Sequence, residues 1–586
     1  MKRLYFFQCQ EDYNRSMYLP YSSGILWAYA KQFKDVTDNY ELVDIYFEKI
    51  GIREYLDKLV DPDVVLFSNY GWNTTYHLGI AKLVKQRWPN CVTVIGGPNA
   101  QQDESYLREH SYVDVSVWGE GEQTLLDLLR QLESDLTKVS GIAYIKNKIY
   151  HKTEIRSRQP DLTQVPSPYL EGIFDSYFDR YDYNFMPVWE TNRGCPYHCT
   201  FCDLGADYYN KLFNFTTERL LAEVDWFVAK KIEYVEIADA NFGILERDLE
   251  LVKHIKRCNE QTGYPQKINA TWAKNSPDRV FEMSKILDSM NRGGVTLALQ
   301  SSNKLALDNI KRFNIVNDRL EQIAIRYIEN NIQTYHDFIL GLPGETLTSW
   351  KVGLLQIVDI NPEGWIFGHP LEAYKNTEFS DPAYIEQHKL KFATTPQVSF
   401  FAKRRIDVPL EMGNYVVETF SMNRDDYIES FLFKWFLITV HSLGWAKYTA
   451  DQVGVSRSEF YNNLYNWMLA NPCMLQEQYN KTKECLTMTL NTGTFWGRQV
   501  FGEDDVWWEY ESASCIEFER QRTRYFKELK EFLDTTYPSL NSSEIADNNN
   551  KDIVRYGIKY TNFKEFCIET YWYGRRRKAW KSNEQS

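Results

Sequence analysis

The chain has 586 residues, of which 43% are hydrophobic and 15% aromatic, and its formal net charge is −13. This length exceeds what one hydrophobic core supports, so we expect roughly two to four domains. The negative charge argues against a general nucleic-acid binder, because the phosphates would be repelled. The sequence contains no run of about 18 apolar residues, so it predicts no membrane span.

The first residues and the cysteine content indicate the compartment. The apolar run at residues 4–7 is too short for a signal peptide and fits a first strand better. Ten cysteines in so long a chain do not indicate a disulfide framework, and a thiolate cluster needs a reducing compartment. We therefore expect a cytoplasmic protein.

Short apolar runs alternate with helical patterns in the first third of the chain. We expect strands at residues 4–7, 41–46, 64–68, 92–95 and 113–117, with helices between them. This alternation predicts a parallel, doubly wound sheet, on which ligands bind at the carboxyl ends of the strands. A flavodoxin-like or response-regulator-like domain has the same pattern. The unusual residues that gather at the strand ends are Ser68, Tyr70, Trp72, Asn73, Gly96, Gly97, Pro98, Gly119, Glu120, Gly121 and Glu122.

Three of the ten cysteines, Cys195, Cys199 and Cys202, lie together at C-x3-C-x2-C spacing. Thiolates are the usual protein ligands of iron–sulfur clusters. No fourth cysteine lies near, so one iron of a [4Fe–4S] cluster would be left for an exogenous ligand. A structural zinc site would need a fourth ligand, and His198 cannot easily reach the metal that its neighbour Cys199 binds. The spacing therefore predicts an iron–sulfur cluster.

The β/α alternation restarts at Phe185. We expect strands at residues 185–190, 234–238, 267–272, 294–299, 334–340 and 364–368, separated by helices. Chemistry in barrel enzymes sits at the carboxyl ends of the strands. There the sequence turns polar, although such residues also serve as helix caps and in loop hydrogen bonds. The residues in question are Asp239, Asn241, Lys274, Gln300, Ser302 and the turn 341–345.

The cysteine loop, with Phe201 before its last cysteine, resembles that of the radical S-adenosylmethionine (SAM) superfamily. In that family the C-x3-C-x-aromatic-C loop leaves one iron to bind the amino and carboxylate groups of SAM. The resemblance implies a partial (β/α)6 barrel. The SAM contacts that it implies are Phe201, Asp239, Asn241, Lys274, Gln300, Ser302 and Gly341.

The strings LPYSSGILWAYA, SNYGWN, GGP and GEGE, ahead of this loop, resemble the cobalamin-binding domain of B12-dependent radical SAM enzymes. The signature Asp-x-His-x-x-Gly is absent, so the resemblance implies a dimethylbenzimidazole tail held away from the metal and no protein histidine on cobalt. Tyr70, Trp72 or Asn73 would approach the lower face, unless Trp72 is a core residue and Asn73 a helix N-cap. The full set of implied cobalamin contacts is Ser68, Tyr70, Trp72, Asn73, Gly96, Gly97, Pro98, Gly119, Glu120, Gly121 and Glu122.

After residue 372 the alternation stops and long helical patterns dominate, as at residues 424–442 and 457–469. We expect this part to cover the barrel mouth and shape the substrate pocket, or else to serve packing or dimerisation. Residues 541–550 read as a flexible loop. The expected fold is therefore α/β, with a cobalamin-binding domain (1–145), a linker (146–182), a radical SAM barrel (183–372) and a mainly helical C-terminal domain (373–586).

The resemblance implies a methyltransferase that uses a [4Fe–4S] cluster, SAM and cobalamin. It would methylate an unactivated carbon of a small molecule through a 5′-deoxyadenosyl radical and methylcobalamin, with an electron donor such as flavodoxin or ferredoxin. A cyclase or ring-rearranging oxidoreductase would use the same cofactors without methyl transfer. A non-catalytic cobalamin carrier or sensor is the third alternative, against which the complete cysteine loop argues.

Overall fold

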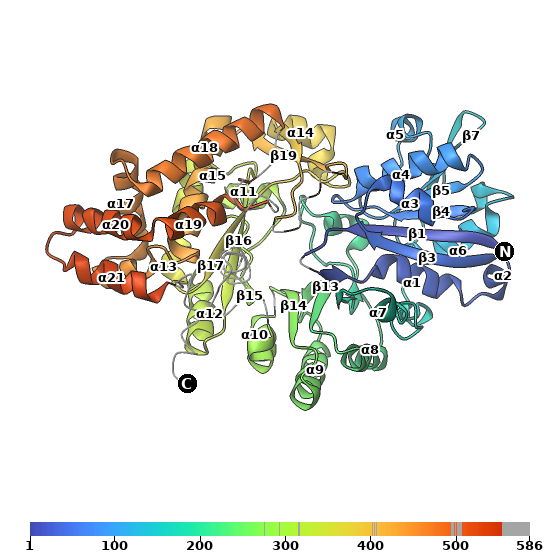
Figure 1. Ribbon diagram of the computed structural model, residues 1–586, viewed down its shortest axis with the longest axis horizontal. Coiled ribbons are helices and arrows are strands. Elements are labelled where there is room, and N and C mark those ends of the chain that lie inside the picture. Colours follow the sequence, from blue (N-terminus) through green and yellow to red (C-terminus); the bar gives the residue numbers. More distant parts are fainter. Residues whose placement is uncertain are drawn as a thin grey trace. The chain divides into compact units, whose positions relative to one another are not determined.

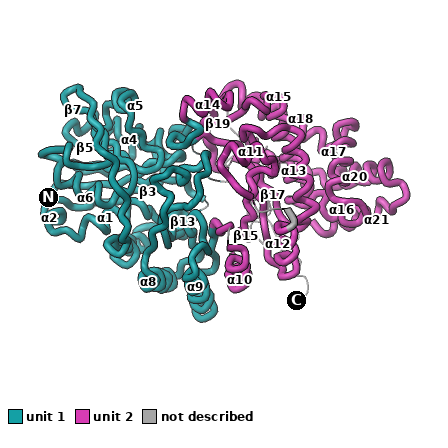
Figure 2. Tube along the Cα trace, turned by 180° about the vertical axis from the view of Figure 1, so that it is seen from behind, with its two compact units in different colours: residues 1–270, 374–380, 402–413 teal, residues 271–373, 381–401, 414–586 magenta. Residues whose placement is uncertain are grey.

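The computed structural model describes residues 1–553, apart from residues 14, 275, 292, 315–316, 401, 403–404, 406, 494–496, 499 and 501–506. The chain forms two compact units, coloured separately in Figure 2. Unit 1 holds residues 1–270, 374–380 and 402–413, and unit 2 holds residues 271–373, 381–401 and 414–586. Among the described residues, none of the helices combines the length and hydrophobicity that a membrane crossing requires.

The N-terminal part of unit 1 is a seven-stranded sheet with strand order β3-β1-β4-β5-β6-β7-β8. Its first five strands pair in parallel, which confirms the predicted doubly wound sheet. They are β1 (Lys2–Gln10), β3 (Tyr40–Glu48), β4 (Val64–Ser68), β5 (Val92–Gly96) and β6 (Val115–Val117).

An antiparallel hairpin, β7 (Ile142–Lys146) and β8 (Ile149–Lys152), extends the sheet into the start of the segment predicted as a linker. Its two turn residues, Asn147 and Lys148, have positive φ angles of 52° and 67°. Such angles suit the tight turn of a hairpin, but the usual signal for that turn is Asn-Gly. Because lysine takes the place of glycine in this turn, the sequence lacks the usual signal and the hairpin was not predicted.

Helices cover both faces of this sheet (Figure 1). The helices α1 (Tyr21–Ala30) and α6 (Glu122–Gln131) pack together on one face. The helices α3 (Ile52–Lys58) and α4 (Thr74–Arg87) pack together on the other. All five residues of β4 are buried, as expected for a central strand of a parallel sheet covered on both faces.

Strands form at all six positions predicted for the barrel, in two sheets of three, but the first and the fourth are only two residues long. The first sheet consists of β10 (Val188–Trp189), β13 (Tyr234–Phe242) and β14 (Lys267–Trp272) in that order. It belongs to unit 1, except for the last two residues of β14, which belong to unit 2. In unit 2, β15 (Val295–Thr296), β16 (Thr334–Leu340) and β17 (Trp365–Pro370) pair in parallel. The accompanying helices are α8 (Thr217–Ala229), α9 (Asp248–Thr262), α10 (Pro277–Leu287), α12 (Asn317–Glu329) and α13 (Leu347–Ile360).

The rest of unit 2 is mainly helical, as predicted. Its longer helices are α15 (Arg424–Leu437), α17 (Arg457–Ala470), α18 (Met474–Thr492), α19 (Tyr510–Arg520), α20 (Arg522–Thr536) and α21 (Ser542–Asp552). The flexible loop predicted at residues 541–550 is wrong, because this segment forms α21. The Asn541 side chain accepts a hydrogen bond from the Glu544 amide at the start of the helix. Asn549 is buried and hydrogen bonded to Thr449 and Trp445, and these distant partners stabilise a polar helix.

Candidate functional site

The three cysteines of the motif lie on one closed loop of unit 1. Strand β11 (Asn192–Arg193) pairs with β12 (Phe213–Asn214), so the two ends of the loop formed by residues 194–212 lie next to each other. The Cys195 amide donates to the Tyr209 carbonyl at 2.9 Å. Gly194 has φ +104°, and a Cβ there would lie 2.1 Å from the Lys211 carbonyl oxygen, so only glycine fits.

The loop offers three thiols to a metal centre. Cys195 and Cys199 are buried and Cys202 is partly buried, and all three are free of disulfides. Burial raises the pKa of the Cys202 thiol to about 11, and the neighbouring Cys199 and Cys195 also raise it. The Cys202 thiol is therefore protonated near neutral pH unless a bound cation stabilises its thiolate. Three sulfur donors on one loop fit three corners of a [4Fe–4S] cluster.

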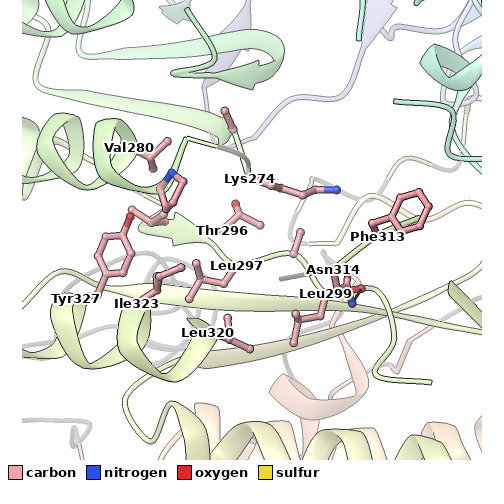
Figure 3. Close-up of a pocket in the computed structure, with 14 residues that line it drawn as sticks. Lys274, Val280, Thr296, Leu297, Leu299, Phe313, Asn314, Leu320, Ile323 and Tyr327 are labelled. Atoms are coloured by element: carbon pink, nitrogen blue, oxygen red, sulfur yellow. Dashed lines mark hydrogen bonds between the residues drawn. The ribbon is translucent and has the colours of Figure 1, made fainter. Parts of the chain in front are cut away.

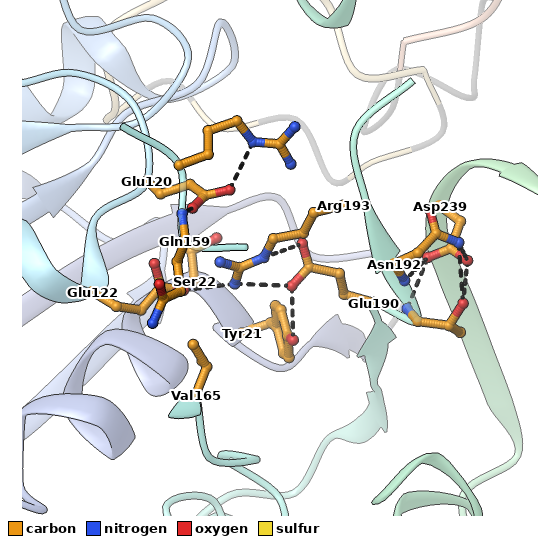
Figure 4. A network of polar contacts seen from close by, with 12 residues as sticks. Tyr21, Ser22, Glu120, Glu122, Gln159, Val165, Glu190, Asn192, Arg193 and Asp239 are labelled. Atoms are coloured by element: carbon orange, nitrogen blue, oxygen red, sulfur yellow. Dashed lines mark hydrogen bonds and ion pairs between the residues drawn. The ribbon is translucent and has the colours of Figure 1, made fainter. Parts of the chain in front are cut away.

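Two of the predicted SAM contacts, Asp239 and Asn241, lie on β13 against the cysteine loop. The Asn241 side-chain amide donates to the Cys195 sulfur at 3.2 Å. The buried Asp239 carboxylate accepts hydrogen bonds from the amides of Thr191 (2.8 Å) and Asn192 (3.2 Å), and from both of their side chains (Figure 4). Burial raises its pKa to about 7. Asp239 thus holds the base of the loop, and its contact with SAM remains a prediction.

The other predicted SAM contacts are divided between the units. Phe201 belongs to the cysteine loop in unit 1, whereas Lys274, Gln300, Ser302 and Gly341 belong to unit 2. Lys274 lines a small pocket of about 30 Å³, together with residues of α10, β15 and α12 (Figure 3). The Gln300 amide donates to the Asp337 carbonyl at 2.7 Å, so Gln300 extends the pairing of β15 with β16. The assembly of these residues into one SAM site remains a prediction.

All eleven predicted cobalamin contacts lie in unit 1, at or just after the carboxyl ends of β4, β5 and β6. Trp72 is 47% exposed and stacks on Tyr70 with ring centroids 4.5 Å apart. The alternative that Trp72 is a core residue is therefore wrong. The Tyr70 hydroxyl lies 2.5 Å from the Ser22 hydroxyl, which joins this aromatic pair to α1.

Asn73 is fully buried and directly precedes α4, but its side chain does not cap that helix. Its side-chain oxygen accepts from the Tyr70 amide at 2.8 Å, and its side-chain nitrogen donates to the carbonyls of Cys9 and Ser68. Asn73 therefore ties the ends of β1 and β4 together. The free amides of α4 are instead bound by Glu411, whose carboxylate accepts from Thr75 and Tyr76 at 2.7 and 2.9 Å.

The turn from Gly119 to Glu122 contacts the cysteine loop. A Cβ at Gly119, where φ is +85°, would lie 2.7 Å from the Tyr208 hydroxyl oxygen. Glu120 pairs with Arg158 at 3.0 Å, and Glu122 pairs with Arg193 at 2.6 Å. Both carboxylates predicted to contact cobalamin therefore already have cationic partners within the protein.

Arg193 is the centre of a buried polar network that the sequence did not reveal (Figure 4). Besides Glu122, its guanidinium binds the Glu190 carboxylate at 3.0 Å. Glu190 in turn accepts from the Tyr21 hydroxyl at 3.1 Å. Since Tyr21 begins α1 and Glu122 begins α6, the network joins two helices of the N-terminal sheet to the residue before Gly194-Cys195.

The histidine nearest the predicted cobalamin site along the chain, His77 of α4, is fully buried. One ring nitrogen accepts from the Cys9 amide at 3.2 Å, and the other lies 2.8 Å from the Asn69 side-chain oxygen. Burial lowers the pKa of His77 well below its ordinary value, and Lys49 lowers it further. Both nitrogens are thus engaged within the fold, which leaves His77 no atom for a metal.

Comparisons with known proteins identify two domain families in the chain. The profile of the radical SAM superfamily matches residues 189–352, and that of the B12 binding domain matches residues 26–129. Two solved structures have a similar fold at 14% identity. They are the cobalamin-dependent SAM radical enzyme OxsB (TM-score 0.58, covering 94% of this chain and 84% of that one) and the methyltransferase TsrM from Kitasatospora setae (TM-score 0.52, 68% and 79%).

Two relatives are more similar in sequence. The cobalamin-dependent radical SAM methyltransferase TokK of Streptomyces tokunonensis is 34% identical over 472 residues. The 2-(S-pantetheinyl)-carbapenam-3-carboxylate methyltransferase of Streptantibioticus cattleyicolor is 33% identical over 477 residues. Each alignment covers 78% of this chain and 69% of the relative. With the cysteine loop and the parallel sheet in place, this chain belongs to the cobalamin-dependent radical SAM methyltransferases, which use a [4Fe–4S] cluster, SAM and cobalamin.

Proposed function

We propose that the enzyme methylates an unactivated carbon of a small carboxylate related to the carbapenam on which one relative acts. The observation that supports this substrate class is the extent of the similarity. Residues 353–586 make up about two-fifths of the chain, so an alignment that covers 78% of it includes part of this region. The resemblance thus reaches the helical part that we expect to shape the substrate pocket, beyond the two domains that many chemistries share.

In that reaction, the residues of this chain would hold the cofactors in position. When bound, the cofactors supply a 5′-deoxyadenosyl radical and a methyl group. Cys195, Cys199 and Cys202 would hold the cluster, and Asn241 would donate a hydrogen bond to the first of these sulfurs. Asp239 keeps the base of the loop in place through its four hydrogen bonds.

The stacked pair of Tyr70 and Trp72 offers a flat aromatic surface at the strand ends for the corrin. We further propose that flavodoxin or ferredoxin reduces the cluster, in a reducing cytoplasm that keeps the three cysteines in the thiol form.

Isotope transfer tests the reaction. We expect that methyl-labelled SAM, with 2-(S-pantetheinyl)-carbapenam-3-carboxylate as probe, gives labelled product together with similar amounts of 5′-deoxyadenosine and S-adenosylhomocysteine. Product formation with deoxyadenosine, but without label or adenosylhomocysteine, would indicate a rearrangement instead. Methylation of an unrelated small molecule, but not of this probe, would contradict the substrate class alone.

The environment of cobalt gives a second, independent prediction. Because both nitrogens of His77 are engaged and the Asp-x-His-x-x-Gly signature is absent, we expect no axial nitrogen on cobalt. The paramagnetic resonance spectrum of the bound cob(II)alamin should then lack nitrogen superhyperfine splitting. Free cob(II)alamin with its own base coordinated serves as the reference, and splitting of that kind in the protein would contradict the prediction.

A further inference from the structure

A second group of metal-ligating side chains lies between α8 and α9, two helices that pack side by side (Figure 1). Helix α8 contributes Asp225. Helix α9 contributes His254 and Cys258, which are four residues apart and therefore on one face of the helix. The Nε2 atom of His254 lies 2.8 Å from Oδ1 of Asp225 and 3.6 Å from Sγ of Cys258. The same Sγ and Oδ1 atoms are 4.0 Å apart.

These three separations are close to those of a tetrahedral zinc site. Zinc binds nitrogen and oxygen at about 2.0–2.2 Å and sulfur at about 2.3 Å, so two of its tetrahedral ligands lie roughly 3.3–3.6 Å apart. The observed values bracket this range, and a turn of the Asp225 side chain, which is 64% exposed, can adjust the shortest and the longest of them. Cys258 is buried and the His254 side chain is 12% exposed, so two of the three donors are held in place by packing.

We propose that Asp225, His254 and Cys258 bind one Zn²⁺ ion, with water as the fourth ligand, and that the ion links α8 to α9. The mixed sulfur, nitrogen and oxygen donors suit zinc better than calcium or magnesium, which prefer oxygen alone. On binding, the Cys258 S–H bond breaks, a Zn–S bond forms and the proton passes to solvent. This site is separate from the cysteine loop and does not depend on the proposed reaction.

Arg257 competes with the metal for His254. A guanidinium nitrogen lies 2.6 Å from Nδ1 of His254, so without metal it donates to Nδ1 while the Nε2 proton is donated to Asp225. Zinc needs the Nε2 lone pair, so the imidazole proton must move to Nδ1 and Arg257 must turn away. Arg257 is exposed at the surface of α9 and is able to do so. Removing this arginine should therefore strengthen zinc binding.

Metal analysis of the reconstituted full-length enzyme tests the site. After equilibration with zinc and removal of loosely held metal, mass spectrometry should find one zinc per chain in addition to the cluster iron. Because loss of an outer-shell partner alone costs about 10- to 100-fold in affinity, Cys258→Ser and His254→Gln should weaken zinc binding by more than about 100-fold. Arg257→Gln should tighten it.

Matched controls separate this site from the other thiols. Cys485→Ser, a change at a half-buried thiol on α18, should leave the zinc in place. Replacing Cys195, Cys199 and Cys202 by alanine should remove the iron but keep the zinc. Unchanged iron content and circular dichroism show that the Cys258 and His254 variants are folded.

A wild-type enzyme that holds no zinc, or equal zinc in the wild type and in Cys258→Ser, would overturn the proposal. Asp225, His254 and Arg257 would then be a surface hydrogen-bond chain. Methyl transfer is not measured in this experiment, so its outcome does not depend on the substrate or on the proposed function.

Discussion

Replacing Cys195, Cys199 and Cys202 together by alanine is expected to abolish the iron–sulfur cluster and, with it, SAM cleavage and methyl transfer. All three sulfur donors come from one loop, whose ends are fixed independently by the pairing of β11 with β12 and by the hydrogen bonds to Asp239. The loop base should therefore still fold when the donors are gone. Iron and sulfide content after anaerobic reconstitution, and the yield of 5′-deoxyadenosine, measure the effect.

The control for this variant is a cysteine outside the loop. Cys485→Ala removes one half-buried thiol on α18 and should leave both the iron content and the deoxyadenosine yield unchanged. A full [4Fe–4S] cluster in the triple alanine variant would show that the ligands lie elsewhere.

Arg193→Met is expected to reduce the free energy of unfolding by about 3–5 kcal/mol, the usual cost of removing one partner from a buried ion pair. The Arg193, Glu122 and Glu190 side chains are only 11%, 8% and 21% exposed, so the two carboxylates would lose their main compensating charge. Although burial lowers the pKa of Arg193, Glu122 and Glu190 raise it well above its ordinary value, so the guanidinium remains charged. Urea unfolding of the full chain, compared between wild type and variant, measures the loss of free energy.

The stabilisation that the Glu122–Arg193 pair contributes should depend on pH. Burial raises the pKa of Glu122, but Arg193 lowers it more, so the folded value lies below the ordinary value of 4.5. A carboxyl group with a lowered pKa stabilises the fold above its unfolded pKa and loses that contribution as the pH falls through the folded one. The contribution of this pair to the stability of the wild type should therefore be full above about pH 4.5 and shrink in more acidic buffer, as urea unfolding at several pH values would measure.

Arg87 provides the matched control. It pairs with Asp57 in the same unit, and the two side chains are 49% and 84% exposed, so Arg87→Met should cost no more than about 1 kcal/mol. In a double-mutant cycle, Glu122→Gln combined with Arg193→Met should cost less than the sum of the two single changes. An Arg193→Met variant as stable as Arg87→Met would show that this network does not hold helices α1 and α6 to the start of the cysteine loop.

Several features were predictable from the sequence because they depend on local patterns. The apolar run of β4 and its neighbours specifies a buried parallel sheet, since every side chain on such a strand meets a covered face. The spacing of Cys195, Cys199 and Cys202 places three thiols on one loop whatever surrounds it.

Other features depend on partners that are far apart in the sequence. Glu122 and Arg193 are separated by 71 residues, and Glu411 binds amides of α4 from 335 and 336 residues away. No periodicity or spacing marks such pairs, because each member alone reads as an ordinary polar surface residue. The segment of α21 was predicted to be a flexible loop for the same reason. Its helix is stabilised by contacts of Asn549 with the distant residues Thr449 and Trp445.

The sequence by itself determined the position of the cysteine loop, the alternation of strands and helices, and the helical C-terminal part. These follow from residue type and spacing, which act over a few neighbouring positions. Only the tertiary structure decided that Trp72 is exposed, that Asp239 and Asn241 bind the base of the cysteine loop, and that Glu120 and Glu122 are neutralised by Arg158 and Arg193. Burial and charge pairing depend on the residues that surround a side chain, and folding brings these residues together from distant segments of the chain.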